Sequence, residues 1–277
     1  MNREGRKLFQ TTEGPQKLDE YLAGPINREL EKVNVWRQVS IVEPVDPLAI
    51  AYFDSDKRKI YGAKITKKRD SLLIDGDGRV TIDEFLIESK EVAIPISELD
   101  VENSDTLKKA KEKLRVSIAV KEDSYGFSLL EAITDKRVIK IDNGDLGTPT
   151  KTELKKIFDD AEDSGNKIRN VVMSPYGPTG IRRWEFKDLD EATRAAILKT
   201  GYMGSLWDAD FYCSDLLPAK TWYFLVDPMM CSWMPIYNDV AIEVVDITND
   251  DLLIVKAVEY VGMVIHDASS ITKIEML

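Results

Sequence analysis

Apolar residues with helical spacing between residues 105 and 133 predict one long helix. Leu107, Ala110, Leu114 and Ile118 fall on a single stripe, as the inward face of an amphipathic helix requires. At the helical rise per residue, such a helix is on the order of 40 Å long, which is the length of a whole domain. One element of the chain is therefore expected to span most of the folded molecule.

Shorter segments also carry helix signals. Thr150 and Glu153 have the spacing of a capping box, which predicts a helix over residues 151–163. Residues 189–199 are expected to form another helix. In the N-terminal part, Gly24–Pro25 is expected to interrupt the helical pattern, and a short helix follows with one apolar face, formed by Ile26, Leu30, Val33 and Trp36.

Runs of β-branched and aromatic residues predict strands over much of the remaining chain. Residues 51–98 read as long strands interrupted by a charged stretch. Beyond residue 165, short apolar runs alternate with turns, in the segments "IRNVVMSP", "DADFYCSD", "TWYFLVDP", "AIEVVDI", "LLIVKAVEYVGMVI" and "ITKIEML". These runs predict a strand-rich second half of the chain.

The acidic stretch "IDGDGRVTIDEF" has two interpretations, a calcium-binding loop or the turn of a β-hairpin. An EF-hand loop with Gly78 at its sixth position places Asp75, Asp77 and Glu84 at ligand positions. Its first ligand position then falls on Leu73, which has no side-chain oxygen. Asp and Gly are favoured turn residues, and the residues after Gly78 alternate as strand residues do. We therefore predict a hairpin turn here and no metal site.

Composition and charge narrow the class of protein. The 277 residues carry 49 acidic and 38 basic side chains, which gives a net charge of −11. An acidic chain repels nucleic-acid phosphates overall, and the closest candidate for a basic stripe, Lys64, Lys67, Lys68 and Arg69, is short. A single histidine and two cysteines disfavour histidine relays and zinc sites. No apolar stretch approaches the roughly 18 residues that cross a bilayer, so we expect no membrane partner.

Catalytic motifs are not evident in the sequence. Gly204–Ser205 lacks the following glycine of a nucleophile elbow, and "SPYGPTGIRR" lacks the lysine and hydroxyl residue of a phosphate-binding loop. Neighbouring carboxylates such as Asp159–Asp160 and Asp250–Asp251 leave an acidic hydrolase as one alternative. The interpretation that we favour is a binding or structural role, with no enzyme activity and no cofactor.

Motifs in the C-terminal part resemble those of one family. Two glycines precede a short strand, a leucine-proline-small-lysine turn, an apolar strand that ends in Asp-Pro, a Met-Pro step and a later Val-Gly-Met step. In this chain they are Gly201 and Gly204, Phe211–Cys213, Leu217–Lys220, Trp222–Pro228, Met234–Pro235 and Val261–Met263. Their order and spacing are similar to the C-terminal half of tailed-bacteriophage major capsid proteins.

The resemblance implies an α+β fold, the phage capsid fold that is named after phage Hong Kong ninety-seven and shared with encapsulins. That fold has an N-terminal arm, an extended β-hairpin loop, a long spine helix, a peripheral domain and an axial domain. Carried onto this chain, the expected units are an arm at 1–50, the hairpin at 51–98, the spine helix and peripheral domain at 99–148, an axial domain at 149–239, and strands at 240–277 that return from the peripheral to the axial domain.

The same resemblance implies a function. The chain would be a major capsid protein that assembles with itself, as hexamers and pentamers, into the icosahedral head of a tailed virus. It would be made in the host cytoplasm, enclose double-stranded DNA non-specifically, and meet scaffolding, portal and decoration proteins. The hairpin would lie on a neighbouring subunit, which makes contact candidates of Lys67, Lys68, Arg69, Asp75, Asp77, Arg79 and, outside the hairpin, Trp36. The alternative is an encapsulin-like compartment that encloses a cargo enzyme.

Overall fold

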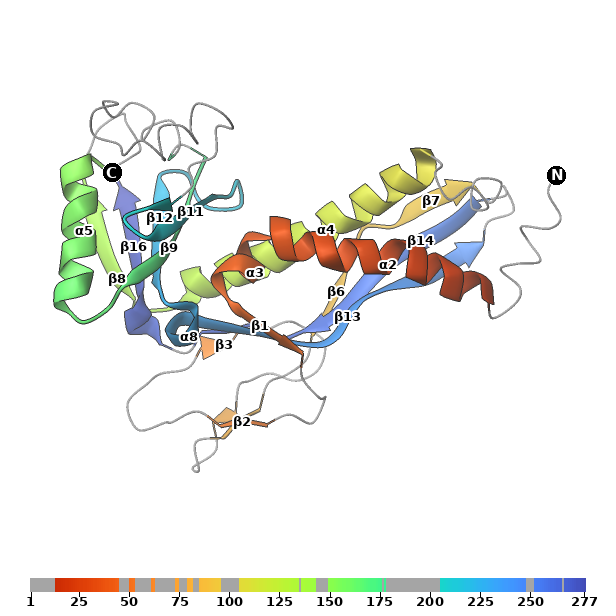
Figure 1. Ribbon diagram of the computed structural model, residues 1–277, viewed down its shortest axis with the longest axis horizontal. Coiled ribbons are helices and arrows are strands. Elements are labelled where there is room, and N and C mark those ends of the chain that lie inside the picture. Colours follow the sequence, from red (N-terminus) through yellow and green to blue (C-terminus); the bar gives the residue numbers. More distant parts are fainter. Residues whose placement is uncertain are drawn as a thin grey trace.

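The computed structural model arranges the chain in two lobes, which are joined by a long helix (Figure 1). One lobe is long and narrow, and the other is more compact and holds the C-terminus. The structure describes residues 13–44, 50–52, 61–62, 73–74, 79–81, 85–95, 105–134, 136–142, 149–175, 177, 205–247, 252–265 and 267–277.

A seven-stranded sheet runs along the long lobe. Its centre is the antiparallel pair of β13 (Ser232–Ile247) and β14 (Leu252–Val261). The other strands flank this pair: β1 (Ile41–Pro44) and β15 (Val264–Ile265) on β13, β3 (Tyr61–Gly62) on β15, and β6 (Phe85–Glu88) and β7 (Val92–Pro95) on β14. The register of the β13–β14 ladder shifts at three places, between Ile236 and Asn238, Asn238 and Ala241, and Val244 and Asp246.

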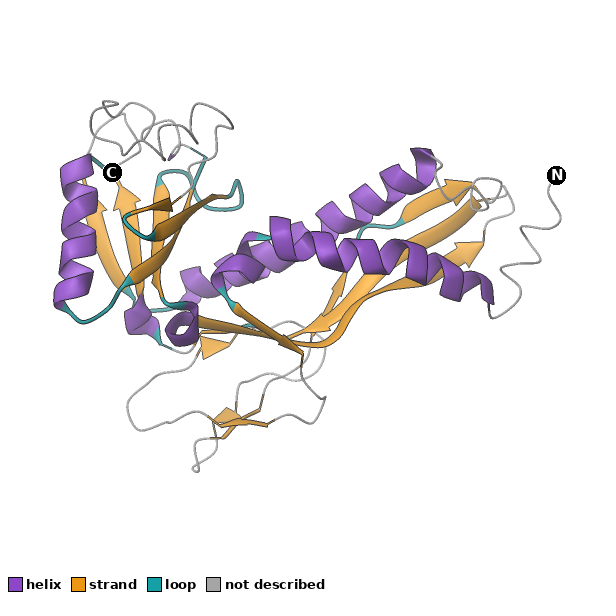
Figure 2. Cartoon of the chain, in the orientation of Figure 1, coloured by secondary structure: helices purple, strands orange, loops and turns teal. Residues whose placement is uncertain are grey.

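Helices cover one face of this sheet (Figure 2). The long helix α4 (Asp105–Ala132) confirms the helix that the apolar stripe predicts. Beside it lies α2 (Glu13–Val33), which is followed by the short helix α3 (Val35–Val39). The apolar side chains of these helices and of the sheet form one buried cluster, so the long lobe is a layer of helices on a layer of strands.

The break expected at Gly24–Pro25 is absent from the structure. α2 begins at Glu13 and continues through Gly24–Pro25, where a break was expected. Proline inside a helix removes one backbone hydrogen bond. Here the helix persists because Leu22 and Ile26, on either side of the proline, are fully buried against the rest of the chain. Tertiary packing therefore outweighs the local helix-breaking signal.

The compact lobe is built on a six-stranded sheet. Its strands, in spatial order, are β10 (Ser205–Leu206), β11 (Ala209–Cys213), β9 (Ile168–Met173), β12 (Thr221–Val226), β16 (Ile271–Met276) and β8 (Arg137–Ile141). All six residues of β12 are buried, because α5 covers one face of the sheet and the core of the long lobe meets the other. This explains why "TWYFLV" is a continuous apolar run rather than an alternating one.

The capping box at the start of α5 (Lys151–Asp163) is confirmed. The Thr150 hydroxyl accepts the Glu153 N–H at 3.3 Å, and Glu153 Oε2 accepts the Thr150 N–H at 2.7 Å. The helix expected over residues 189–199 lies outside the described residues. Two short elements, α8 (Pro228–Cys231) and the 3₁₀ turn η4 (Ala268–Ser270), contact each other where the lobes join.

The segment expected to form one extended hairpin is divided between two sheets. β6 and β7 pair with β14 in the long lobe, and Ile87 and Ile94 are fully buried there. The return strand therefore packs within its own chain, because its apolar face completes the core beneath α4. The remaining strands, β2 (Ile50–Tyr52), β4 (Leu73–Ile74) and β5 (Arg79–Thr81), form a small three-stranded sheet.

A close contact between Trp36 and Gly126 fixes the crossing of α3 and α4. A Cβ atom on Gly126 would overlap the indole ring of Trp36, so no side chain larger than hydrogen fits at this position. The ring also packs edge-on against Phe127, with 6.3 Å between the ring centroids. The absent side chain at Gly126 thus lets a large aromatic residue lie directly on the helix backbone.

Replacement of Gly126 by alanine is expected to destabilise the fold by about 1–3 kcal/mol, the usual cost of overpacking a core. Ser124→Ala, at an exposed position on the same helix, is the matched control and is expected to leave stability nearly unchanged. Thermal unfolding followed by circular dichroism measures both. Equal midpoints for Gly126→Ala and the native chain would contradict the packing described here.

Candidate functional site

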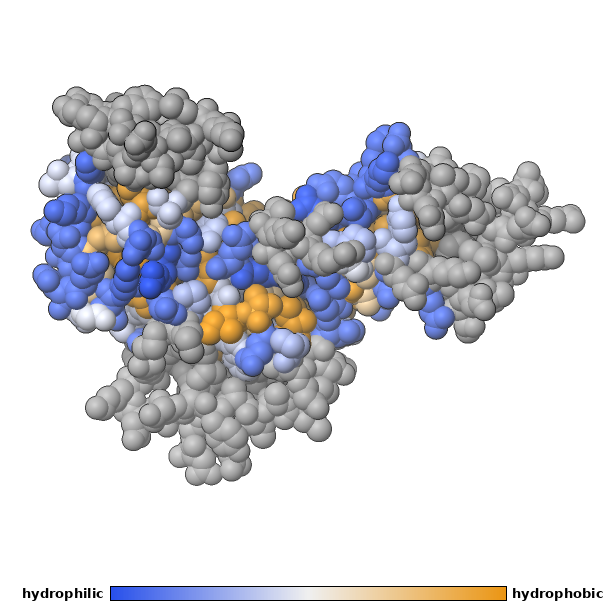
Figure 3. Space-filling view, viewed as in Figure 1, coloured by the Kyte–Doolittle hydropathy of each residue, from blue (hydrophilic) through white to orange (hydrophobic). Residues whose placement is uncertain are grey.

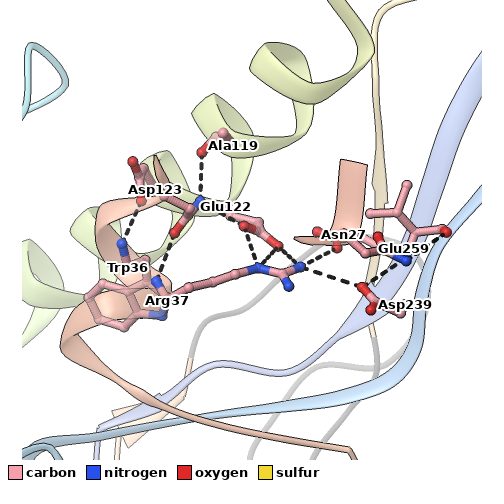
Figure 4. A network of polar contacts seen from close by, with 10 residues as sticks. Asn27, Trp36, Arg37, Ala119, Glu122, Asp123, Asp239 and Glu259 are labelled. Atoms are coloured by element: carbon pink, nitrogen blue, oxygen red, sulfur yellow. Dashed lines mark hydrogen bonds and ion pairs between the residues drawn. The ribbon is translucent and has the colours of Figure 1, made fainter. Parts of the chain in front are cut away.

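Three buried charged side chains meet where α3, α4 and β14 converge (Figure 4). Arg37 Nη2 lies 2.6 Å from Glu122 Oε1 and 3.0 Å from Glu259 Oε2. The Arg37 side chain is 2% exposed, and both glutamate side chains are 0% exposed. One guanidinium group therefore ties an N-terminal helix to the long helix and to the central sheet.

Glu122 is fully supplied with hydrogen bonds. Its Oε1 accepts from Arg37 Nε at 2.9 Å and from Nη2, so the pair is bidentate. Its Oε2 accepts from Asn34 Nδ2 at 2.6 Å and from Arg37 Nε at 3.1 Å. Asn34 Oδ1 in turn accepts the Arg37 backbone N–H at 2.7 Å and caps the start of α3. The cluster thus also sets where α3 begins.

The neighbouring carboxyl group of Asp123 holds the same helix end from α4. It accepts the backbone N–H groups of Trp36 at 2.7 Å and Val35 at 3.4 Å. Burial raises the pKa of Asp123 to about 7, against the lowering effect of those two backbone donors. The first turn of α3 is therefore bound to α4 through consecutive acidic residues.

Glu259 is the less satisfied of the two buried glutamates. Its Oε1 has no hydrogen-bond partner among the described residues, whereas its Oε2 accepts from Arg37. Burial first, and then the charge of Glu122, raises the pKa of Glu259 well above its ordinary value. Asp239, which is 48% exposed and 3.7 Å from Arg37 Nη2, adds further negative charge.

A second junction connects the far end of α4 to the compact lobe. Glu131 accepts hydrogen bonds from Tyr223 Oη at 2.6 Å and from Lys273 Nζ at 2.8 Å, which belong to β12 and β16. Lys136 Nζ donates to the Glu131 and Ile133 carbonyl oxygens near the end of the helix. Polar contacts thus fix the C-terminal half of α4 to both lobes, through Glu122 and Asp123 to the long lobe and through Glu131 to the compact lobe.

The sequence did not point to these acidic residues. Glu259 lies in the apolar run "LLIVKAVEYV", and its alternation with Leu253, Val255 and Ala257 places it on the buried face of β14. The signal that could have revealed Glu259 as a buried charged residue is its place in an alternating pattern of apolar residues. Its partner Arg37 is more than 200 positions away, so the sequence alone could not supply it.

The sequence-predicted contact candidates fall in different places. Trp36 is fully buried within the chain, so its role here is in the core rather than at a surface. Arg79 begins β5, which pairs antiparallel with β4, as the hairpin prediction requires. The other candidates lie outside the described residues: Lys67, Lys68, Arg69, Asp75 and Asp77.

The described surface also exposes apolar side chains. Val116 and Val120 are one helical turn apart on the outer side of α4, with 44% and 45% of their surface exposed. Ile41 and Val42 of β1 are half-buried, and Figure 3 shows apolar surface over this strand. These positions are candidates for contacts with another molecule.

The described residues hold neither a metal cluster nor a membrane-spanning helix. They contain no group of three or more histidine, cysteine, aspartate or glutamate side chains arranged to hold a metal ion. Among the same residues, no helix has the length and apolar character needed to cross a membrane.

Replacement of Arg37 by methionine is expected to cost about 3–5 kcal/mol of folding stability, because two buried carboxyl groups lose their cation. Lys167→Met is the control: it breaks the exposed pair with Asp208, and surface pairs contribute at most about 1 kcal/mol. Urea denaturation at pH 7 measures the difference. Similar losses for the two variants would show that the cluster does not hold the lobe together.

Comparison with known proteins gives a likeness in structure and none in sequence. No family model and no curated protein matches the sequence. Among solved structures, a virus-like particle from Pyrococcus furiosus matches with a TM-score of 0.57 and 12% identity, over 94% of this chain and 98% of its own. The capsid of Myoviridae phage XM1 matches with a TM-score of 0.52 and 13% identity, over 88% and 92% of the two chains.

An encapsulin matches to the same degree as the phage capsid. The SrpI encapsulin from Synechococcus elongatus PCC 7942 has a TM-score of 0.52 and 13% identity, and the match covers 88% of both chains. All three matches extend over nearly the whole chain and include both lobes. The capsid resemblance read from the sequence is thereby confirmed at the level of fold: this chain has the α+β fold of tailed-phage major capsid proteins, which encapsulins share.

Proposed function

We propose that the chain is a major capsid protein that assembles into the icosahedral head of a tailed virus around double-stranded DNA. The observation that carries this proposal is the end-to-end match, over both lobes, to protein shells of known structure. We assign the arm, spine and two-domain organisation of that fold to this chain as well, with α4 as the spine helix. The six-stranded lobe is then the axial domain, and the seven-stranded lobe is the peripheral domain.

The shape of the subunit supports assembly. A long lobe that is one helical layer on one sheet leaves much of its surface uncovered, and the exposed valines of α4 lie on that surface. Closed shells form when many copies repeat the same contacts around symmetry axes. We infer that hexamers and pentamers of this chain form the shell, and that scaffolding, portal and decoration proteins join it.

We infer a structural rather than an enzymatic role. A catalytic site would need charged groups that can act on a substrate. The buried charged groups of this chain instead join secondary-structure elements to one another, as Arg37 and Glu122 do. The net charge of −11 suits a wall that encloses DNA without binding it tightly. The DNA is then held by the closed shell, not by base or phosphate recognition.

An encapsulin-like compartment is the second candidate, because the encapsulin and the phage XM1 capsid match with the same TM-score of 0.52. The contents of purified particles separate the two. Nuclease-protected DNA of genome length supports the viral head, whereas one co-purifying enzyme without DNA supports the compartment. A single species of 31.4 kDa in ultracentrifugation, at every salt and protein concentration, would contradict both.

Val120→Asp is expected to reduce shell yield at least tenfold while leaving the subunit folded. The side chain is exposed in the single chain, so the new charge costs little there, but it would be buried without a partner in a contact between copies. Lys108→Asp, exposed in the first turn of the same helix, is the control, since an acidic residue is favourable there. Electron microscopy counts shells, and circular dichroism checks the fold. Normal yield from Val120→Asp would remove α4 from the proposed contacts.

The hairpin around Asp75 and Asp77 is proposed to contact a neighbouring subunit. Shortening residues 67–79 to an Asn-Gly turn is expected to leave far-ultraviolet circular dichroism almost unchanged and to lower the melting temperature of the particle. Reversal of both aspartates to lysine is expected to have a weaker effect of the same sign, larger at low ionic strength, because exposed charges are screened by salt. Unaltered particles from the shortened chain would contradict this role.

A further inference from the structure

The number of charges in the buried cluster does not balance. Glu259 of β14 faces Arg37 from α3, Glu122 from α4 and the half-exposed Asp239 from β13. Its cross-strand neighbour on β6 is the apolar Ile87, which brings no charge. One guanidinium group therefore serves two fully buried carboxyl groups, with a third carboxylate close by.

Two ionised carboxylates at one buried cation are unfavourable, and such a pair keeps a proton that an exposed pair would lose. The hydrogen bonds show which group keeps it. Both oxygens of Glu122 accept N–H bonds, from Arg37 and Asn34, so neither oxygen lacks a donor. Glu259 has one oxygen in contact with Arg37 and one without a partner among the described residues. A neutral carboxyl group leaves less charge on that unpartnered oxygen than a carboxylate would, so the proton is less costly to keep there.

We propose that Glu259 stays protonated in the folded chain at neutral pH, and that loss of this proton at higher pH loosens α2 and α3 from α4 and the sheet. The cluster is then a pH-dependent lock on the N-terminal helices. The proposal goes beyond the proposed shell function and does not depend on it, because every group in the lock belongs to a single chain.

The direction of the effect follows from linkage. An unfolded chain releases the Glu259 proton near the ordinary pKa of 4.5, whereas the folded chain holds it to a higher pH. The stability that this group contributes is therefore complete below about pH 4.5 and is lost as pH rises toward the raised folded pKa. Asp123 acts in the same direction, with a pKa raised from 3.8 to about 7, so its contribution must be separated.

The buried cluster holds only the N-terminal helices in place. Arg37 and Asn34 are the contacts of the N-terminal helices with Glu122 and Glu259, and Asp123 holds the next turn of α3. A surplus negative charge at Glu259 weakens these contacts between the N-terminal helices and the rest of the long lobe. The compact lobe has its own apolar core and is not affected. Residues 13–39 are therefore expected to open first as pH rises.

The first test locates the proton. Infrared spectra of the full-length chain at pH 7 are compared with those of Glu259→Gln, and the carbonyl band of a protonated carboxyl group is expected in the difference. Glu243→Gln is the control, since Glu243 is 52% exposed and pairs with Lys256. It is expected to give no such band. No band for Glu259→Gln, or a band that only Glu122→Gln removes, would overturn the proposal.

The second test follows stability between pH 5.5 and 9 by urea denaturation, in an Asp123→Asn background and in one assembly state. A one-proton difference lowers the folding constant by up to tenfold per pH unit, and Glu259→Gln is expected to remove this slope. Hydrogen exchange is expected to rise in residues 13–39 and not in β9. Identical slopes with and without Glu259 would overturn the proposal, whatever the chain assembles into.

A variant at the edge of the cluster covers the case in which Glu259→Gln does not fold. Asp239→Asn removes a half-exposed negative charge that raises the pKa of Glu259. The midpoint of the stability loss is then expected to move to lower pH, with a smaller total loss. A midpoint that does not move would show that Glu259 is not the group that titrates.

Discussion

The structure depends on how the β13–β14 pair is covered. This pair is long and apolar on one face, and α4 alone leaves part of that face uncovered. The N-terminal helices complete the layer, and they are fixed by two different interactions at one place. Trp36 lies on the bare backbone of Gly126, and Arg37 joins Glu122 to Glu259. Packing there sets how closely the helices approach, and the ion pairs set which residues face one another.

Much of the local structure could be predicted from the sequence. The stripe along α4 and the capping box of α5 depend on residues a few positions apart, so the chain pattern is enough to find them. The apolar runs of β9, β12 and β16 were found for the same reason, since their length and composition are typical of buried strands. Motif order in the C-terminal part also indicated the fold, which the structural matches confirm.

The features that could not be predicted from the sequence depend on contacts between residues that are far apart along the chain. Gly24–Pro25 looked like a break because the packing of Leu22 and Ile26 is not visible in the local pattern. The return strand of the expected hairpin joined β14 for a similar reason, since its apolar face has a place only in the assembled core. The buried cluster is the extreme case: Arg37 and Glu259 come together only when both ends of the chain have folded against α4.

The register shifts along β13 have a mechanical consequence. A strand of 16 residues is about 50 Å long, and a regular ladder would make it a stiff, evenly twisted beam. Three interruptions in its pairing with β14, at Ile236, Asn238 and Val244, place local bends in that beam. The curvature of the long lobe is therefore encoded in the backbone at a few positions. Substitutions on its apolar face are therefore expected to change the stability of the lobe more than its curvature.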